Sequence, residues 1–318
     1  MDSTFVVGID VGGQTSKIGV VNARGTVLVQ TVIRTDTYDQ VQPYIAELAD
    51  AVKKLIAEAG VEGKVRGIGV GAPNGNYYTG TIENAPNLLW GRQRVEFAKL
   101  LSEAMGGLPV ALTNDANAAA VGEMTYGAAR GMKNFIMITL GTGVGSGIVI
   151  NGEVVYGHDG FAGELGHTAA VHNNGRTCGC GKTGCLETYA SATGVARTAR
   201  EWLELSDEPS LLRNLDTIAS KDVYEAAKEG DKLALKIFLF TGKILGRSFA
   251  DFIAFSAPEA IVLFGGLARA KEFLTGPIEE SMNANVLPLW RNKVKVVYSE
   301  LKESDAAILG ASALAWEL

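Results

Sequence analysis

One short stretch, residues 163–187, concentrates the side chains best suited to binding a metal ion. It holds all three cysteines of the chain, Cys178, Cys180 and Cys185, and His167 lies eleven residues before the first of them. Three thiolates and one imidazole form a complete tetrahedral set for zinc, and the glycines between them permit the tight turns that would aim them inward. Four protein ligands leave no open position for water, so we expect a structural zinc site.

Other interpretations of this stretch fit its composition less well. Buried cysteines are often simple core residues, but this segment is too polar and too rich in glycine to be core. Three cysteines cannot all pair as disulfides. His158 competes with His167 as the fourth ligand, while His172 lies in an asparagine-rich loop. The spacing Cys-x-Cys-x4-Cys is not that of a zinc finger, so we do not expect a nucleic-acid module. The same loop carries Glu164 and Glu187. A structural zinc would hold this loop in place, which implies that these two carboxylates have a role other than binding the metal.

The N-terminus predicts a strand, a glycine turn and a second strand. Phe5–Val11 is an apolar run that contains Asp10, and the segment 12–17 leads into a strand over 18–21 and a third over 26–31. A Rossmann or Walker loop would be followed by a helix, which is not predicted here. The backbone N–H groups of such a turn can still bind phosphate, and Asp10 could hold Mg²⁺. The alternative is an ordinary glycine turn.

The same plan restarts about 130 residues later. A strand is predicted over Asn134–Leu140, followed by a glycine loop over 141–147 and by strands over 148–150 and 153–155. Two such arrangements indicate two related domains, each of which could bring a glycine turn to one shared polyphosphate. This duplication strengthens the phosphate interpretation of both turns.

Two further strands end in residues that suit a binding site. The strand over Leu108–Leu112 leads to Asn114 and Asp115, and α/β proteins place reacting groups at such carboxyl ends. The alternative role for Asp115 is a plain helix N-cap. The strand Ala260–Phe264 leads to Gly265 and Gly266, which would allow close approach of adenine or, alternatively, tight packing of strand on helix.

The remaining elements complete an α/β pattern. Helices are predicted over 42–58, 94–105, 191–205, 220–229, 232–255 and 306–316, and strands over 65–70 and 293–298. Ile45, Leu48, Val52 and Leu55 form the apolar stripe of the first helix, which Gly60 ends.

Composition limits the class of protein and its compartment. With 318 residues and 47% hydrophobic residues, the chain suits about two domains with substantial cores. A net charge of −6 argues against general binding of nucleic acid. No basic segment with a cleavage site precedes the first strand, and no apolar run approaches the ~18 residues of a membrane span. Together with the few cysteines, these features predict a cytoplasmic protein that does not associate with membranes.

These motifs, taken in order, resemble the ROK family of sugar kinases and repressors. The segments that carry the resemblance are 10–17, 114–117, 140–147, 164–167, 178–187 and 263–266. The resemblance implies a two-domain actin/hexokinase-like (ribonuclease H-like) α/β fold, with a cleft between the domains and a structural zinc loop over 167–187. The expected smaller domain covers residues 1–117 plus a C-terminal helix at about 305–318, and the larger covers 118–304.

The resemblance also implies roles for individual residues. Asp115 matches the catalytic base. The residues matching sugar ligands are Asn84, Asn87, Asn114, Asp115, Glu164, His167 and Glu187. The zinc ligands are His167, Cys178, Cys180 and Cys185. The residues matching ATP and Mg²⁺ contacts are Asp10, Gly12, Gly13, Gln14, Thr15, Lys17, Gly141, Thr142, Gly143, Gly145, Gly265 and Gly266. Gln14 replaces the threonine that is more common in the family.

By this resemblance the chain is expected to be an ATP-dependent hexose kinase that converts glucose to glucose 6-phosphate, working as a homodimer or homotetramer. Kinases for N-acetylmannosamine, N-acetylglucosamine, fructose or allose share the motifs. A sugar-sensing repressor would carry an N-terminal helix-turn-helix, for which a first strand at Phe5 leaves no room. A non-catalytic sugar binder would have no need of Asp115.

Overall fold

The computed structural model describes residues 4–318, including all side chains except those of residues 303 and 304. The chain divides into two compact units. The first comprises Met1–Met132, Gly147–Gly163 and Glu300–Leu318, and the second comprises Lys133–Ser146 and Glu164–Ser299. Residues 118–132 and 147–163 thus group with the first unit, whereas the sequence predicts them in the second domain. The reason is that helix α3 (Asp115–Tyr126) packs along α9 (Glu303–Leu314).

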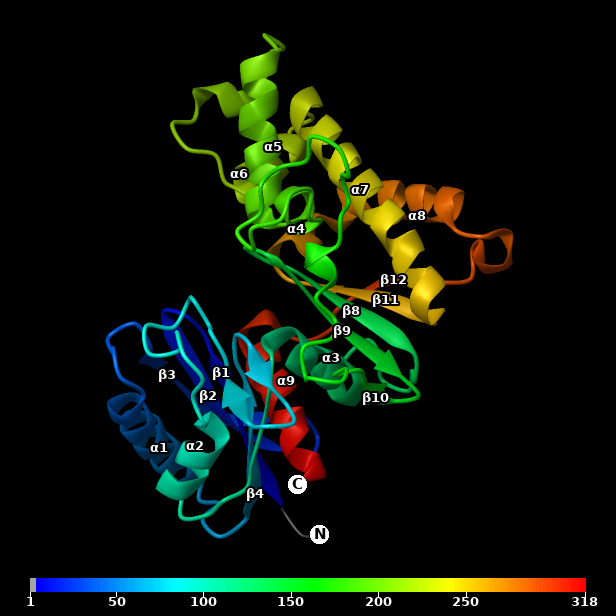
Figure 1. Ribbon diagram of the computed structural model, residues 1–318. Coiled ribbons are helices and arrows are strands. Elements are labelled where there is room, and N and C mark those ends of the chain that lie inside the picture. Colours follow the sequence, from blue (N-terminus) through cyan, green and yellow to red (C-terminus); the bar gives the residue numbers. More distant parts are fainter. Residues whose placement is uncertain (1–3) are drawn as a thin grey trace. The chain divides into compact units, whose positions relative to one another are not determined.

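The first unit is built on a five-stranded sheet (Figure 1) with the order β3-β2-β1-β4-β7. Its strands are β1 (Phe5–Val11), β2 (Thr15–Asn22), β3 (Val27–Arg34), β4 (Val65–Gly71) and β7 (Val110–Thr113). Strands β1, β2 and β3 pair antiparallel, and β4 pairs parallel with both β1 and β7. The central strands are continuous apolar runs because both faces of the sheet are covered.

Helices cover the two faces of this sheet. Val7 and Ile9 of β1 pack with α1 (Val41–Glu58) and α2 (Phe97–Ala104), whereas Val6 packs with Ile308 of α9. This division follows from the alternation of side chains along a strand. The predicted stripe of α1 is confirmed, because Ile45, Leu48, Val52 and Leu55 are all buried.

Helix α9 lies directly on the backbone of two strands. A Cβ atom on Gly8 would clash with the carbonyl oxygen of Ile308, and one on Gly69 would clash with that of Ala311. Only glycine allows a helix to approach β1 and β4 this closely. The last helix of the chain is therefore an integral layer of the unit that contains the first strand.

The second sheet has the order β10-β9-β8-β11-β12. Its strands are β8 (Phe135–Leu140), β9 (Val144–Ile150), β10 (Glu153–Val154), β11 (Ala260–Phe264) and β12 (Lys295–Tyr298). Strand β9 begins at Val144 and not at residue 148, so Gly145 and Gly147 lie in a strand and the glycine loop is shorter than predicted. The order strand, glycine turn, strand, turn, strand does occur twice, as the sequence indicates.

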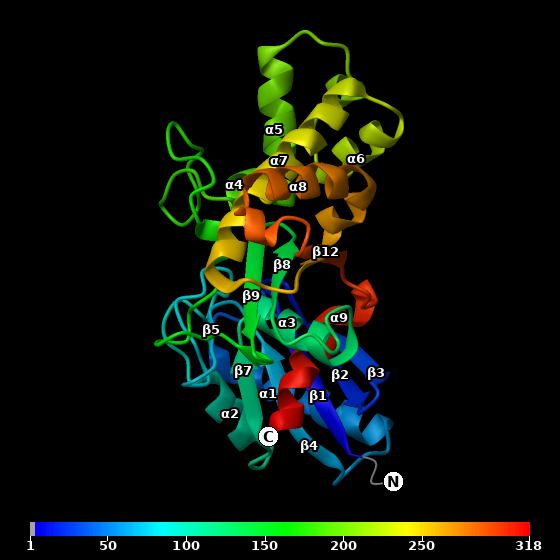
Figure 2. The same cartoon turned by 90° about the vertical axis from the view of Figure 1, so that its right-hand side faces the viewer.

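The helices of the second unit are α4 (Glu187–Ala190), α5 (Ala192–Leu205), α6 (Ser220–Lys228), α7 (Lys232–Ser256) and α8 (Lys271–Asn285), which Figure 2 shows from the side. Helices α7 and α8 pack closely, because Gly242 of α7 faces Pro277 and Gly246 faces the carbonyl of Ile278. The shorter elements are β5 (Gly75–Asn76), β6 (Thr81–Ile82), and the 3₁₀ helices η1 (Leu165–His167), η2 (Leu211–Asn214), η3 (Gly266–Ala270), η4 (Pro288–Trp290) and η5 (Ala315–Glu317).

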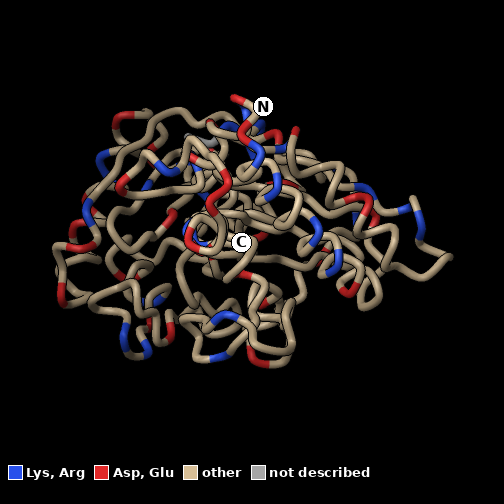
Figure 3. Tube along the Cα trace, turned by 90° about the horizontal axis from the view of Figure 1, so that it is seen from above, with Lys and Arg blue, Asp and Glu red and all other residues tan. Residues whose placement is uncertain are grey.

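Acidic and basic residues are distributed along the described chain without long runs of one sign. Figure 3 shows Lys and Arg interspersed with Asp and Glu along the trace. Among the described residues, every helix is too short or too polar to span a bilayer.

Candidate functional site

The glycine turn of the first unit connects β1 to β2 and is closed by its own backbone. The Gly12 N–H donates to the carbonyl of Thr15 at 3.0 Å, and the Gln14 carbonyl accepts the N–H of Thr35 at 2.9 Å. Thr15 and Lys17 belong to β2, where Lys17 is paired with Asp10. The Gly12 N–H is therefore already used within the turn, and Gly13 and Gln14 form its tip.

Asp10 stands at the end of β1 as a half-buried carboxylate. Burial, together with the nearby carboxylate of Asp115, raises the pKa of Asp10 from 3.8 to about 6, and Lys17 opposes this rise. A carboxylate destabilised in this way is a natural ligand for a divalent cation, because the cation relieves both the desolvation and the repulsion between carboxylates. The carboxylate of Asp10, with that of Asp115 nearby, therefore has the chemistry of a Mg²⁺ ligand.

Asn114 and Asp115 follow β7 and begin α3. Asn114 is the N-cap, and its side-chain oxygen accepts the N–H of Asn117 at 2.7 Å. The alternative in which Asp115 is the N-cap is therefore wrong. Asp115 is the first helical residue. It keeps access to solvent although protein surrounds it closely, and its Oδ1 accepts the N–H of Ala116 at 2.8 Å. Desolvation by the protein around it raises the pKa of Asp115, and the bond from Ala116 opposes this rise.

The loop with Asn84 and Asn87 lies against the glycine turn of the same unit. Both asparagines are exposed, while Leu88 and Trp90 anchor the loop in the core. A Cβ atom on Gly13 would lie 2.9 Å from the carbonyl oxygen of Asn87, so the loop and the turn are in direct contact. The predicted sugar loop and the predicted phosphate turn are thus neighbours.

The glycine turn of the second unit is also tied down by hydrogen bonds. The Gly141 N–H donates to the Gly143 carbonyl at 3.1 Å, and the Gly145 N–H donates to Thr139 Oγ1 at 3.1 Å. The Val144 N–H donates to Glu187 Oε2 at 2.9 Å. The N–H groups of residues 141, 144 and 145 are therefore occupied, and Thr142 and Gly143 form the tip of the turn.

The four predicted metal ligands come together in the second unit. The ligand atoms of His167, Cys178, Cys180 and Cys185 all lie within 4.8 Å of one another. The backbone explains this, because residues 169 and 185 form a β-bridge and a tight turn joins Cys178 to Lys182. His167 occupies the position for which His158 was the alternative.

Two of the distances between these atoms match the edges of a tetrahedral zinc site, and all of them are within 4.8 Å. The sulfurs of Cys180 and Cys185 are 3.7 Å apart, and Nδ1 of His167 is 3.6 Å from the sulfur of Cys178. A Zn–S distance of ~2.3 Å and a Zn–N distance of ~2.0 Å give tetrahedral edges of roughly 3.8 and 3.5 Å. Burial raises the pKa of the Cys185 thiol to about 12, so a dication is what would hold it as a thiolate.

The polar residues predicted to bind sugar in this unit flank the metal cluster. Glu164 precedes η1, which carries His167, and the His167 N–H donates to the Glu164 carbonyl at 3.1 Å. Glu187 begins α4, and its Oε1 lies 3.9 Å from the sulfur of Cys178. Glu187 therefore contacts both the metal loop and, through Val144, the glycine turn.

The predicted adenosine motif follows β11. Gly265 has a φ angle of 105°, and a Cβ atom there would lie 2.6 Å from the carbonyl oxygen of Leu140. Gly265 is thus needed for close packing against the end of strand β8, which is a different contact from the strand-on-helix packing considered as the alternative. Space for a Cβ atom on Gly266 is open, so this residue is free to face a ligand.

Some residues that shape the site were not predicted from the sequence. Asn74 donates from Nδ2 to the carbonyls of Glu83 and Asn84 at 2.9 and 3.0 Å, which fixes the sugar loop. Asn74 has a φ angle of 51°, and the dipeptide Asn74-Gly75 is the sequence signal of such a turn. Arg176, buried beneath the metal loop, gave no sequence signal.

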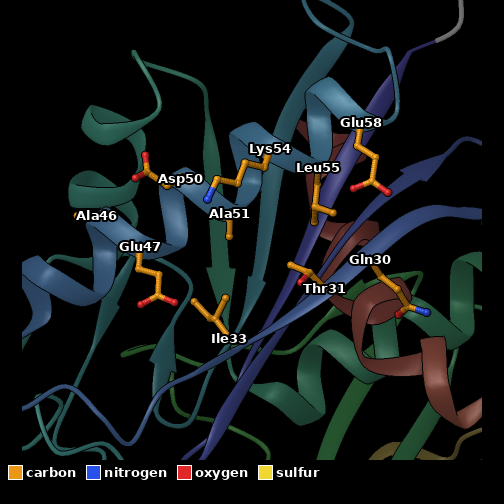
Figure 4. Close-up of a pocket in the computed structure, with 10 residues that line it drawn as sticks. All are labelled: Gln30, Thr31, Ile33, Ala46, Glu47, Asp50, Ala51, Lys54, Leu55 and Glu58. Atoms are coloured by element: carbon orange, nitrogen blue, oxygen red, sulfur yellow. The ribbon is translucent and has the colours of Figure 1, made fainter.

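An open hollow of about 660 Å³ lies between β3 and α1. Figure 4 shows Glu47, Asp50 and Lys54 of α1 on one side and Ile33 of β3 on the other. The residues that line it include none of the predicted site residues, so this hollow is separate from the candidate site.

Each α/β unit has a glycine turn between two strands, the first unit has a carboxylate after β7, and the second has a Cys₃His cluster, as the resemblance to sugar kinases implies. The model of the ROK family matches residues 6–317, and the chain belongs to this family. It is 39% identical over 315 residues to a glucokinase from Halalkalibacterium halodurans, covering 98% of this chain and 94% of that one.

Solved structures of ROK family proteins are similar to this chain over nearly its whole length. A ROK family glucokinase from Streptomyces griseus, in complex with glucose and AMPPNP, is similar with a TM-score of 0.79 and 32% identity, covering 99% of this chain and all of that one. A ROK family transcriptional regulator has a TM-score of 0.88 and 28% identity, covering 99% of this chain and 78% of that one. The two-domain α/β fold expected from the sequence is confirmed.

Proposed function

We propose that this protein is an ATP-dependent hexose kinase that transfers the γ-phosphate of Mg-ATP to a hydroxyl of glucose. The observation that carries the proposal is the state of Asp115. Asn114 caps helix α3, and the solvent-accessible carboxylate of Asp115, whose Oδ1 accepts the Ala116 N–H, can take up a proton. Similarity to the glucokinase from H. halodurans and to the glucose complex from S. griseus supports glucose as the substrate.

In the proposed mechanism, Asp115 accepts the proton of the sugar hydroxyl as its oxygen attacks the γ-phosphorus. A base with a raised pKa suits this task, because it can hold the proton after transfer. Asp10 would hold Mg²⁺, which when bound neutralises charge on the transferring phosphoryl group. The tips of the two glycine turns would donate backbone N–H groups to the phosphates.

The proposed sugar ligands belong to two groups. Asn84, Asn87 and Asn114 lie in the first unit, and Glu164, His167 and Glu187 lie in the second. Amides and carboxylates suit sugar hydroxyls, because hydroxyls both donate and accept hydrogen bonds. In this proposal zinc holds the loop that carries the second group and takes no part in the chemistry.

An ADP-release assay with Mg-ATP tests the proposal. Glucose, mannose, fructose, N-acetylglucosamine and N-acetylmannosamine would be compared at equal concentration. We expect turnover with glucose at a higher kcat/KM than with any other sugar. Clear preference for another sugar would retain the kinase and replace the substrate.

A sugar-sensing regulator without kinase activity is the second candidate, favoured by the structural similarity to the ROK transcriptional regulator. The same assay separates the two. A regulator would show no turnover with any sugar, while a sugar would still raise the melting temperature through binding.

We further propose a cytoplasmic homodimer or homotetramer. Exposed apolar side chains in the second unit support self-association, since Phe255 at the end of α7 is 89% exposed and Leu287 and Leu289 after α8 are more than half exposed. Light scattering coupled to size-exclusion chromatography would test this. A monomer at micromolar concentration would reject it.

A further inference from the structure

Arg176 is a buried arginine that joins the metal loop to helices α4 and α5. It lies two residues before Cys178 and is only 9% exposed. Its Nη1 donates to the carbonyl of Thr188 at 2.8 Å and to that of Gly194 at 3.3 Å. Its Nη2 donates to Thr198 Oγ1 at 2.9 Å. One side chain therefore connects the loop to the carbonyl ends of α4 and to the start of α5.

Helix α4 needs such a support because it has only four residues, Glu187–Ala190. A single turn has too few internal hydrogen bonds to hold its own position. Arg176 secures it from two sides. Its guanidinium lies 4.5 Å from the centre of the Tyr189 ring, and its backbone N–H donates to the Tyr189 hydroxyl at 2.8 Å. Figure 2 shows α4 beside α5 and the loop that leads into it.

The guanidinium of Arg176 has its partners within the protein, where it shares the carboxylate of Glu201 with Arg197. Glu201 of α5 accepts from Nη2 at 2.5 Å and from Nε at 3.1 Å, and it also accepts from Arg197 Nε at 2.7 Å. Because the guanidinium of Arg176 already has a carboxylate partner in Glu201, it does not require a bound ligand to neutralise it. Its contacts therefore indicate a role in positioning.

The position of α4 determines where the carboxylate of Glu187, the first residue of this helix, lies. Its Oε2 accepts the Val144 N–H of the glycine turn at 2.9 Å, and its Oε1 lies 3.9 Å from the sulfur of Cys178. A shift of α4 along the metal loop would change both distances at once. Arg176 links the backbone of α4 to that loop through Thr188, whose own hydroxyl donates to the carbonyl of Cys185 at 2.8 Å.

We propose that Arg176 is a positioning residue that fixes the Glu187 carboxylate between the metal loop and the glycine turn, and thereby sets the affinity for sugar. The inference rests on the proposed function of Glu187 as a sugar ligand. Arg176 would act through α4, without contacting the substrate itself. A misplacement of about 1 Å at a ligand of this kind is enough to weaken catalysis or binding strongly.

The test compares Arg176→Lys with Arg197→Lys. Both arginines bond to Glu201, but only Arg176 bonds to the backbone of α4, so Arg197→Lys is a matched control. The kcat and the KM for glucose and for ATP would be measured well below the melting temperature of each variant, with the zinc content measured in parallel. We expect Arg176→Lys to raise the KM for glucose by about tenfold, with less than twofold change in the KM for ATP and full zinc content. Arg197→Lys should change each by less than twofold.

A purely structural role predicts a different result. If Arg176→Lys lowers the melting temperature but leaves the KM for glucose within twofold of the wild type, the proposal is refuted. A general rise of both KM values with loss of zinc would refute it too. If Arg176→Lys does not fold, Glu201→Gln serves as the second variant, because it weakens the pairing that holds the Arg176 side chain. We expect it to raise the KM for glucose by about threefold, which is more than Arg197→Lys should. An unchanged KM there would overturn the inference.

These outcomes are distinct from a failure of the proposed function. Wild-type protein that turns over none of the sugars would reject the kinase itself. Wild-type turnover of glucose together with a normal KM in the folded variants would reject only the role of Arg176.

Discussion

Asp10→Asn is expected to stabilise the folded protein at neutral pH while abolishing kinase activity. Burial and the nearby Asp115 carboxylate raise the pKa of Asp10 from 3.8 to about 6. Each pKa unit corresponds to about 1.4 kcal/mol, so ionising this carboxylate costs the fold up to about 3 kcal/mol at pH 8. Partial exposure of Asp10 reduces the figure, and we expect about 2 kcal/mol. An amide of the same shape avoids this cost.

The sign of the pH dependence follows from proton binding. Between pH 4 and 6 the folded protein holds a proton on Asp10 that the unfolded chain has lost, so the stability contributed by this group falls as pH rises through that range. The variant carries no such group. The difference in free energy of unfolding, variant minus wild type, should therefore be near zero at pH 4 and should grow to about 2 kcal/mol by pH 7.5.

Urea unfolding without Mg²⁺ or nucleotide, at half-unit pH steps from 4 to 8, measures this difference directly. Titrations of groups that do not interact with Asp10 cancel, because both proteins share them. Asp39→Asn, at an exposed position, is the control and should give a difference close to zero throughout. A pH-independent difference, or a variant less stable than wild type at pH 7.5, would refute the reasoning.

Three other substitutions have defined outcomes. Asp115→Ala should lower kcat by about 10³-fold while sugar still raises the melting temperature, and retained turnover would exclude Asp115 as the base. Cys180→Ala should release zinc and lower the melting temperature, whereas unchanged metal content with unchanged melting would exclude a structural zinc. Gly69→Ala should lower the free energy of unfolding by up to about 3 kcal/mol, because the new Cβ atom meets the carbonyl of Ala311. The comparison for it is Gly276→Ala in helix α8, where nothing lies within 4 Å of the new atom, so the loss caused by the clash in Gly69→Ala should be absent in urea unfolding.

The strands were predictable from the sequence wherever they are continuous apolar runs. Strand β11 has the predicted bounds, Ala260–Phe264, because both of its faces are buried. Helix α8 was missed, since Gly276 and Pro277 interrupt a sequence of weak periodicity and the helix depends on packing against α7. Helix α2 begins three residues later than predicted, because Val95 pairs with Ile82 in a β-bridge.

The site was predictable in its residue types but not in its hydrogen bonds. The Cys₃His cluster could be predicted because all four ligands lie within nineteen residues. Which N–H groups of the glycine turns are already occupied could not, because the partner of Val144 lies 43 residues away in Glu187. The role of Asn114 as N-cap was equally hidden, since asparagine and aspartate are both good caps.

The direct packing of α9 on β1 and β4 has a consequence for the order of events during synthesis. The ribosome makes the first strand at the start of translation, but the helix that covers Gly8 and Gly69 follows only after residue 302. The second unit is complete by Ser299, before that helix has been made. The face of β1 and β4 that α9 covers therefore stays exposed while the second unit folds. A chaperone that binds this face would act during that interval.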